Sequence, residues 1–265
     1  MTTDGRTLEV SQISKRYGGV VAVADVSLAL RPAQIHGLIG PNGAGKSTTL
    51  GLISGFVPAD SGSARWGDQQ LMGASPLRIV QAGIARTFQG ATPFRGMTVL
   101  DNLLVGVHTR GRSGLLAAML RTPGYRRDER RLRELAGQLL SEVGLEVPLD
   151  ADAADLSFGQ LRLLEIARAL GTAPQALLLD EPAAGLNRQE TDKLAAEIRR
   201  LKDRGVSVLV VDHDMPFVFG TCEWITVMNF GRVIASAEPR QVEVDPAVRA
   251  AYLSAAEDEG EVEAA

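Results

Sequence analysis

The strongest constraint in the sequence is the segment GPNGAGKS at residues 40–47, which matches the pattern G-x-x-x-x-G-K-[ST] in full. An apolar stretch at 34–39 predicts a short strand before it, and residues 48–56 predict a helix after it. In this setting glycines let backbone N–H groups turn inward around a phosphate, and the helix start adds partial positive charge. The pattern therefore predicts an α/β fold that binds a nucleoside triphosphate, which leaves kinases, GTPases, motors and transport ATPases open.

The lysine of this segment stands out against the composition of the chain. Only four of the 28 basic residues are lysines, and one of them is Lys46. A lysine supplies a compact point charge to the β- and γ-phosphates, whereas the wide fork of an arginine fits less well inside the loop. Ser47, the next residue, offers a hydroxyl to Mg²⁺.

The rest of the chain predicts two antiparallel strands, a helical region and a parallel sheet. Residues 8–17 and 20–30 flank Gly18-Gly19 and predict a hairpin. From Thr98, which has capping-box spacing to Asp101, the pattern is helical to about residue 156. Helices are then predicted at 126–140, 158–170 and 188–201, and strands at 61–67, 83–88, 176–179, 206–211, 224–229 and 232–236. We expect one domain over 1–255, with a helical insertion at about 90–170, and a disordered acidic tail at 256–265.

Composition excludes several classes of protein. With 45% hydrophobic residues and 23% charged residues, the chain suits one large soluble domain. A net charge of −4 argues against nucleic acid as the main ligand. The single cysteine, Cys222, excludes a disulfide framework and a Cys-based zinc cluster. No apolar run approaches the roughly 20 residues of a membrane span, and the first ten residues predict no signal peptide, so we expect a cytosolic protein.

Charged residues follow two of the predicted parallel strands. Asp180-Glu181 ends one strand and Asp212-His213 ends another, at the sheet edge where α/β proteins bind ligands. We interpret Asp180 as an anchor for Mg²⁺, Glu181 as the general base for water and His213 as a contact of the γ-phosphate. The alternatives are that the acidic pair begins a helix before Pro182 and that His213 is structural.

The residues before the helix at 158–170 allow two interpretations. Ser157 and Gln160 have the spacing of a capping box, which alone accounts for both residues. Gly159 leaves the helix start open, and an uncovered N-terminus with a serine hydroxyl is an anion site. Spacing does not decide between them.

The segment LSFGQ at 156–160 is similar to the LSGGQ signature of ABC-transporter ATPases, and the companion motifs follow in family order. The resemblance covers about residues 8–253. The matching positions are Tyr17 for the aromatic that stacks on adenine, 40–47 for the phosphate loop, Gln89 for the Q-loop glutamine, Asp180 and Glu181 for the magnesium aspartate and the base, 185–187 for the D-loop and His213 for the switch histidine.

This resemblance implies a RecA-like P-loop ATPase core that binds ATP and Mg²⁺. It implies that Glu181 and His213 are catalytic and that Ser47, Gln89 and Asp180 are metal ligands. The implied nucleotide contacts are Tyr17, Gly40, Pro41, Asn42, Gly43, Ala44, Gly45, Lys46, Ser47, Thr48, Gln89, Ser157, Gly159 and Gln160.

The family also implies partners. Two ATP-binding subunits enclose two ATP molecules, so the signature residues are expected to contact the γ-phosphate across the interface with a second copy or a paralogue. Gln89 is implied to link nucleotide state to a permease groove. Phe88, Phe94 and Met97 are candidate coupling contacts, with core packing as the alternative.

The stretches ARTFQ, LSFGQ, LLLDEPAAGLN, DHDM and NFGRVIA resemble the ATP-binding subunits of branched-chain amino acid importers. That branch implies a peripheral protein on the cytoplasmic face of the membrane, with separate permeases, an extracytoplasmic solute-binding protein and no nucleic acid. Phe158 in place of tyrosine, Arg188 in place of proline and residues 228–230 depart from its pattern.

Other functions remain open at this point. Urea or short-amide importers and lipid exporters share much of the pattern. A soluble ABC ATPase acting on nucleic acid usually has two cassettes, which this chain lacks, and a small-molecule kinase gives no reason for the signature. An inactive regulatory homologue is disfavoured because Lys46, Glu181 and His213 are all present. The arginine-rich stretch 121–133 is interpreted as a solvated helix face.

Overall fold

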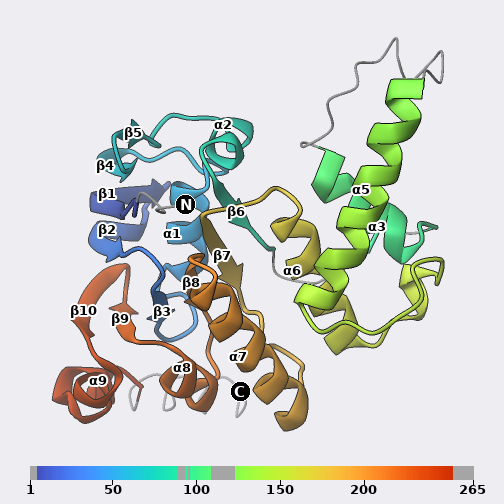
Figure 1. The fold of residues 1–265 in the computed structure, drawn as a ribbon. Coiled ribbons are helices and arrows are strands. Elements are labelled where there is room, and N and C mark those ends of the chain that lie inside the picture. Colours follow the sequence, from blue (N-terminus) through green and yellow to red (C-terminus); the bar gives the residue numbers. More distant parts are fainter. Residues whose placement is uncertain (1–4, 89–92, 95, 109–122, 253–265) are drawn as a thin grey trace. The chain divides into compact units, whose positions relative to one another are not determined.

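The computed structural model describes residues 5–88, 93–94, 96–108 and 123–252, without the side chains of 123, 125 and 126 (Figure 1). The chain divides into two compact units. One unit, called here the core unit, consists of residues 1–86, 175–184 and 198–265. The other, called here the helical unit, consists of residues 87–174 and 185–197.

The described strands form two sheets in the core unit. The antiparallel sheet has the order β2-β1-β4-β5, with β1 Leu8–Tyr17, β2 Val20–Leu30, β4 Ser61–Trp66 and β5 Gln69–Gln70. The six-stranded sheet has the order β10-β9-β3-β8-β7-β6, with β3 Ile35–Ile39, β6 Ile84–Arg86, β7 Ala176–Asp180, β8 Ser207–Val211, β9 Trp224–Asn229 and β10 Arg232–Ala237. Only β10 in this sheet pairs antiparallel. The predicted parallel α/β sheet preceded by an antiparallel subdomain is therefore confirmed.

The three central strands β3, β7 and β8 are buried at every residue. Continuous burial is what a parallel strand covered on both faces requires, and their Val, Leu and Ile residues satisfy it. Because β7 pairs with β8 in register from Ala176 to Asp180, the two strands end at the same edge of the sheet. β3 ends at that edge too, since Leu38 pairs with Val211.

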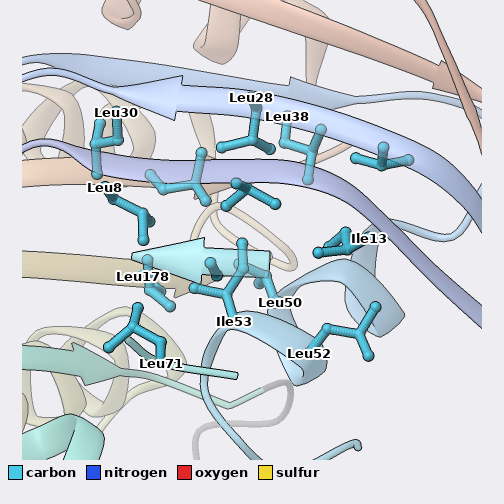
Figure 2. Packing of buried hydrophobic residues seen from close by; sticks show 14 of the residues in the cluster. Leu8, Ile13, Leu28, Leu30, Leu38, Leu50, Leu52, Ile53, Leu71 and Leu178 are labelled. Atoms are coloured by element: carbon cyan, nitrogen blue, oxygen red, sulfur yellow. The ribbon is translucent and has the colours of Figure 1, made fainter. Parts of the chain in front are cut away.

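Helix α1 (Lys46–Ile53) lies in the hydrophobic core between the two sheets. Leu50, Leu52 and Ile53 of this helix pack with Leu8 and Leu30 of the antiparallel sheet and with Leu38 and Leu178 of the parallel sheet (Figure 2). All of these side chains are buried. Burying a leucine or isoleucine contributes about 2 kcal/mol, so packing on both faces fixes the helix that follows the phosphate motif.

Three helices pack together in the helical unit (Figure 1): α3 (Val99–Val107), α5 (Pro123–Glu142) and α6 (Phe158–Leu170). A short 3₁₀ helix at Ala153–Asp155 precedes α6. The predicted capping box begins α3, because the Thr98 hydroxyl accepts the Asp101 N–H and the Asp101 carboxylate accepts the Thr98 N–H. On α5, Arg131 lies 3.9 Å from Asp128 and Arg133 lies 3.1 Å from Glu129, which fits a solvated helix face over its described side chains.

The structure also differs from the sequence predictions. Helices α2 (Pro76–Gln81), α8 (Met215–Thr221), α9 (Pro239–Val244) and a helix at 246–252 were not predicted, nor was β5. The first three are six or seven residues long, too short for a clear 3.6-residue period, although each has proline in its first turn. Helix α7 (Arg188–Asp203) runs two residues beyond its predicted end, and α1 begins at Lys46 rather than at residue 48.

The acidic tail lies beyond residue 252 and outside the described residues. Within the described part of the chain, none of the helices combines the length and the apolar character that crossing a bilayer requires.

The burial of His36 in this core predicts that the stability of the protein depends on pH. The imidazole is 1% exposed; Nδ1 lies 3.0 Å from the Ala29 carbonyl oxygen and Nε2 lies 2.8 Å from Thr226 Oγ1. Burial lowers the pKa of His36 to about 4, so between pH 6.5 and about 4 the unfolded chain binds a proton that the folded chain does not. The free energy of unfolding should therefore fall by about 3 kcal/mol as pH is lowered through that range.

Urea unfolding at a series of pH values measures this dependence. His36→Gln should remove the His36 part of the slope, whereas His108→Gln, at an exposed histidine, should leave it unchanged. An unaltered slope in His36→Gln contradicts the assignment.

Candidate functional site

The phosphate loop is fitted closely between two backbone segments. A Cβ added at Gly40 would lie 2.1 Å from the Met228 carbonyl oxygen, and one at Gly45 would lie 2.3 Å from the Ala22 carbonyl oxygen. Both glycines also have positive φ, of 154° and 97°. Only glycine satisfies both conditions, because another residue would collide with the backbone of β9 or β2.

Hydrogen bonds hold the loop in shape. The Ala44 N–H donates to the Pro41 carbonyl at 3.1 Å, and the Ala44 carbonyl accepts the Gly231 N–H at 3.1 Å. Gly43 has φ 78°, and an added Cβ there would meet nothing within 4 Å. Asn42 and Gly43 are exposed, so the loop has one side packed on the sheet and one side open.

Lys46 is buried at the first position of α1. Its Nζ donates to the carbonyl oxygens of Gly40 at 2.7 Å and Pro41 at 2.9 Å, so the ammonium lies inside the loop. Burial lowers the pKa of Lys46, and the charges of Glu181, Asp180 and Asp212 act against that shift. The loop lysine and the carboxylates at the ends of β7 and β8 therefore form one charged cluster, as predicted from the strand ends.

Ser47 and Thr48 complete the first turn of α1, with Ser47 exposed and Thr48 half-buried. Among the described residues, no group of three or more His, Cys, Asp or Glu side chains is placed to hold a metal by itself. A serine hydroxyl and one carboxylate fit Mg²⁺ bound together with nucleotide phosphates, because Mg²⁺ takes oxygen ligands and often only one or two from the protein.

Asp180 is the last residue of β7 and Glu181 follows it, and the two residues make different hydrogen bonds. The buried Asp180 accepts a hydrogen bond on Oδ2 from Arg86 Nη2 at 2.9 Å. Glu181 has φ 46°, and its N–H donates to the Val211 carbonyl at 2.7 Å. Strained non-glycine backbone of this kind is concentrated at functional sites. The alternative of a helix start is wrong, since the next helix begins at Arg188.

Asp212, predicted from the sequence only as the end of a strand, holds the turn after β7 in position. It is fully buried; Oδ2 accepts the Ala183 N–H at 2.8 Å, and Oδ1 accepts the N–H groups of His213 and Asp214 at 2.8 and 3.0 Å. His213 Nδ1 lies 3.7 Å from the same oxygen, and the imidazole is 61% exposed. The exposed ring is available to a ligand, whereas the buried carboxylate fixes the backbone on both sides.

Tyr17 is the last residue of β1 in the same unit, and half of it is exposed. Lys15 Nζ lies 5.7 Å from its ring centroid and pairs with Asp60 at 2.8 Å. The position is that of an accessible aromatic ring on a fixed strand end, which suits stacking on a base.

The signature residues lie in the helical unit and form the predicted capping box. Ser157 Oγ accepts the Gln160 N–H at 3.3 Å, and Gln160 Oε1 accepts the Ser157 N–H at 2.9 Å. Ser157 is nevertheless exposed, and a cavity of about 540 Å³ opens beside it, lined also by Gly159, Glu190 and Lys193. The capping interpretation is confirmed, and anion binding at the helix start stays a prediction.

Gln89 lies outside the described residues. The backbone of the preceding residue, Phe88, is held by the signature helix, because Glu165 Oε1 accepts its N–H at 2.8 Å and Arg162 Nη1 lies 3.4 Å from its carbonyl. Phe88, Phe94 and Met97 are 39–44% exposed, so core packing does not account for them.

The comparisons with known proteins agree with this geometry. Residues 23–184 match the family model described as ABC transporter. The chain belongs to the ABC transporter family. It is an ABC ATPase, which confirms the resemblance carried by the motifs.

Two relatives of this ABC ATPase match almost end to end. The high-affinity branched-chain amino acid transport ATP-binding protein BraF of Pseudomonas aeruginosa is 41% identical over 94% of this chain and 98% of its own. LivG of Escherichia coli K12, of the same description, shows the same identity and coverage. The ADP conformation of MJ1267, an ATP-binding cassette of an ABC transporter, superposes with a TM-score of 0.82 at 32% identity over 94% of this chain and 98% of its own, which confirms the fold.

Lys46→Ala tests whether the phosphate loop binds ATP through this lysine. The substitution removes the point charge inside the loop, so the affinity for ATP should fall by about tenfold or more, measured by isothermal titration calorimetry. Lys202→Ala, which removes a surface lysine paired with Glu223, is the matched control and should leave the affinity unchanged. A folded Lys46→Ala protein that binds ATP as tightly as the wild type would contradict the assignment of Lys46 as a phosphate ligand.

Proposed function

We propose that this chain is the ATP-hydrolysing subunit of an importer of branched-chain or related hydrophobic amino acids. The observation that carries the proposal is the end-to-end match, at 41% identity, to two ATP-binding proteins of branched-chain amino acid transport. The cluster of Lys46, Asp180 and Glu181 beside the phosphate loop supports the ATPase chemistry.

In the proposed reaction, ATP lies with its base against Tyr17 and its phosphates in the loop of residues 40–47. Lys46 turns from the carbonyl oxygens that now hold it toward the β- and γ-phosphates. Glu181 takes a proton from the water that attacks the γ-phosphorus, and the bond from that phosphorus to the β–γ bridging oxygen breaks, so that ADP leaves with the bridging oxygen. His213 contacts the γ-phosphate. Asp212 maintains the spacing of Glu181 and His213, because its carboxylate accepts hydrogen bonds from the backbone of Ala183 and His213.

Mg²⁺ would be held by Ser47, Asp180 and Gln89, and it would neutralise charge that develops on the phosphate oxygens. The chain supplies the hydroxyl on the first turn of α1 and the carboxylate at the end of β7. Both donors are on elements packed into the core, so the fold itself places them beside the phosphate loop.

The functional unit is proposed to be a pair of ATP-binding subunits, formed by two copies or by this chain and a paralogue. Ser157, Gly159 and Gln160 of each subunit would contact the γ-phosphate bound by the other. Hydrolysis removes that phosphate and opens the pair. The pair would act on permease subunits at the cytoplasmic face of the membrane, with Phe88, Phe94 and Met97 as contacts and an extracytoplasmic protein binding the solute. Nucleic acid is not a proposed partner.

Glu181→Gln tests the assignment of Glu181 as the general base. The amide keeps the size of the side chain but cannot accept a proton, so phosphate release should fall by about 10²–10⁴-fold while ATP affinity is retained. Glu223→Gln, at a surface carboxylate, is the control and should hydrolyse ATP normally. Wild-type turnover in Glu181→Gln would refute the assignment.

Ser157 permits a test that separates capping from phosphate contact. Asp and Asn both cap helices as well as Ser, but only Asp places a negative charge at the helix start. On the Glu181→Gln background, ATP should dimerise Ser157→Asn as it does the parent, and it should fail to dimerise Ser157→Asp, as measured by light scattering. Equal dimerisation of the two variants would show that the partner's phosphate does not approach Ser157.

A further inference from the structure

Arg86 makes an ion pair with the proposed metal ligand. It is the last residue of β6, and its side chain is 10% exposed. Nη2 donates to Asp180 Oδ2 at 2.9 Å, and Nη1 donates to Ser54 Oγ at 2.9 Å. The guanidinium also lies 6.0 Å from the ring centroid of Phe56.

The contact with Ser54 fixes the guanidinium relative to the phosphate-loop helix. Ser54 is the C-cap residue of α1, and its Oγ donates to the Leu50 carbonyl at 2.6 Å. Arg86 therefore joins the end of α1 to the end of β7 by two hydrogen bonds from one planar group. Because Ser54 already holds the planar guanidinium, the guanidinium loses little further freedom when it donates to Asp180. The Asp180 carboxylate is thereby held in one orientation.

The charges explain why a cation is needed there. Asp180, Glu181 and Asp212 bring three carboxylates near Lys46, and Asp180 and Asp212 are almost fully buried. A buried carboxylate needs a hydrogen-bonded counter-charge, and an arginine supplies one at any physiological pH because it does not deprotonate. A divalent cation at Asp180 would supply the same counter-charge, so arginine and metal would compete for the same carboxylate, whose Oδ2 accepts the hydrogen bond from Arg86.

We propose that Arg86 is a positioning residue that acts as the resident counter-charge of Asp180 and keeps divalent metal from binding before the nucleotide. Metal then enters with the triphosphate, whose oxygens supply the ligands and the negative charge that Asp180 alone lacks while it is paired with Arg86. This inference rests on the proposed function, in which Asp180 is a metal ligand.

The test measures Mn²⁺ binding to the nucleotide-free protein by electron paramagnetic resonance. Arg86→Met removes the charge, and its affinity for Mn²⁺ should rise by about tenfold or more over the wild type. Arg86→Gln is neutral but can still donate a hydrogen bond, and the same rise is expected. Arg86→Lys keeps the charge and should stay near the wild type. Arg232→Met, at a surface arginine, is the control and should bind as the wild type does.

An unchanged Mn²⁺ affinity in both neutral variants overturns the proposal. So does an equal rise in Arg86→Lys, because the effect would then come from lost packing and not from lost charge. If both neutral variants fail to fold while Arg86→Lys folds, Arg86 serves stability alone and the proposal is also overturned.

Asp180→Asn separates this inference from the proposed function. If Asp180→Asn binds Mn²⁺ with ATP as the wild type does, the metal-ligand role of Asp180 fails. If Asp180→Asn loses that binding and Arg86→Met gains no affinity without nucleotide, only the inference about Arg86 fails.

Discussion

The close approach of the phosphate loop to the backbones of β9 and β2 determines how the site is built. Glycine at 40 and at 45 permits this approach, because an added Cβ would lie 2.1 Å from the Met228 carbonyl oxygen at the first position and 2.3 Å from the Ala22 carbonyl oxygen at the second. The loop is thereby held at the end of the sheet, where Lys46 meets the carboxylates of the neighbouring strands. A loop that hung free in solvent would have to be ordered by the ligand, at a cost in binding free energy.

The second constraint is charge. Three carboxylates converge where the central strands end, and each has a partner supplied by the fold. Asp180 has Arg86, Asp212 has backbone N–H groups, and Lys46 lies among all three carboxylates. Removing a single partner from such a group leaves a buried charge uncompensated, which costs several kcal/mol. The same electrostatics therefore serve stability and the binding of a negatively charged nucleotide with its metal.

Much of this arrangement could be predicted from sequence because it is local or periodic. Strands β1, β2 and β9 and helix α6 have the predicted bounds, and both capping boxes follow from spacings of three residues. The pairing of Arg86 with Asp180 joins residues 94 positions apart, and the bond from Ala183 to Asp212 spans 29. The spacing of apolar residues along the sequence carries no information about pairs that lie so far apart in the chain. The short helix α8 was missed for a related reason, since seven residues show too little of a helical repeat, although Asp214 caps it and Pro216 lies in its first turn.

A structure of the protein with Mg²⁺ and a non-hydrolysable ATP analogue tests the central claim most directly. The β-phosphate is expected within the loop of residues 40–47, with Lys46 Nζ moved from the Gly40 and Pro41 carbonyls to the phosphates and Asp180 facing the metal. Residues 157–160 of a second subunit are expected against the γ-phosphate. A triphosphate bound away from Lys46 would contradict this arrangement.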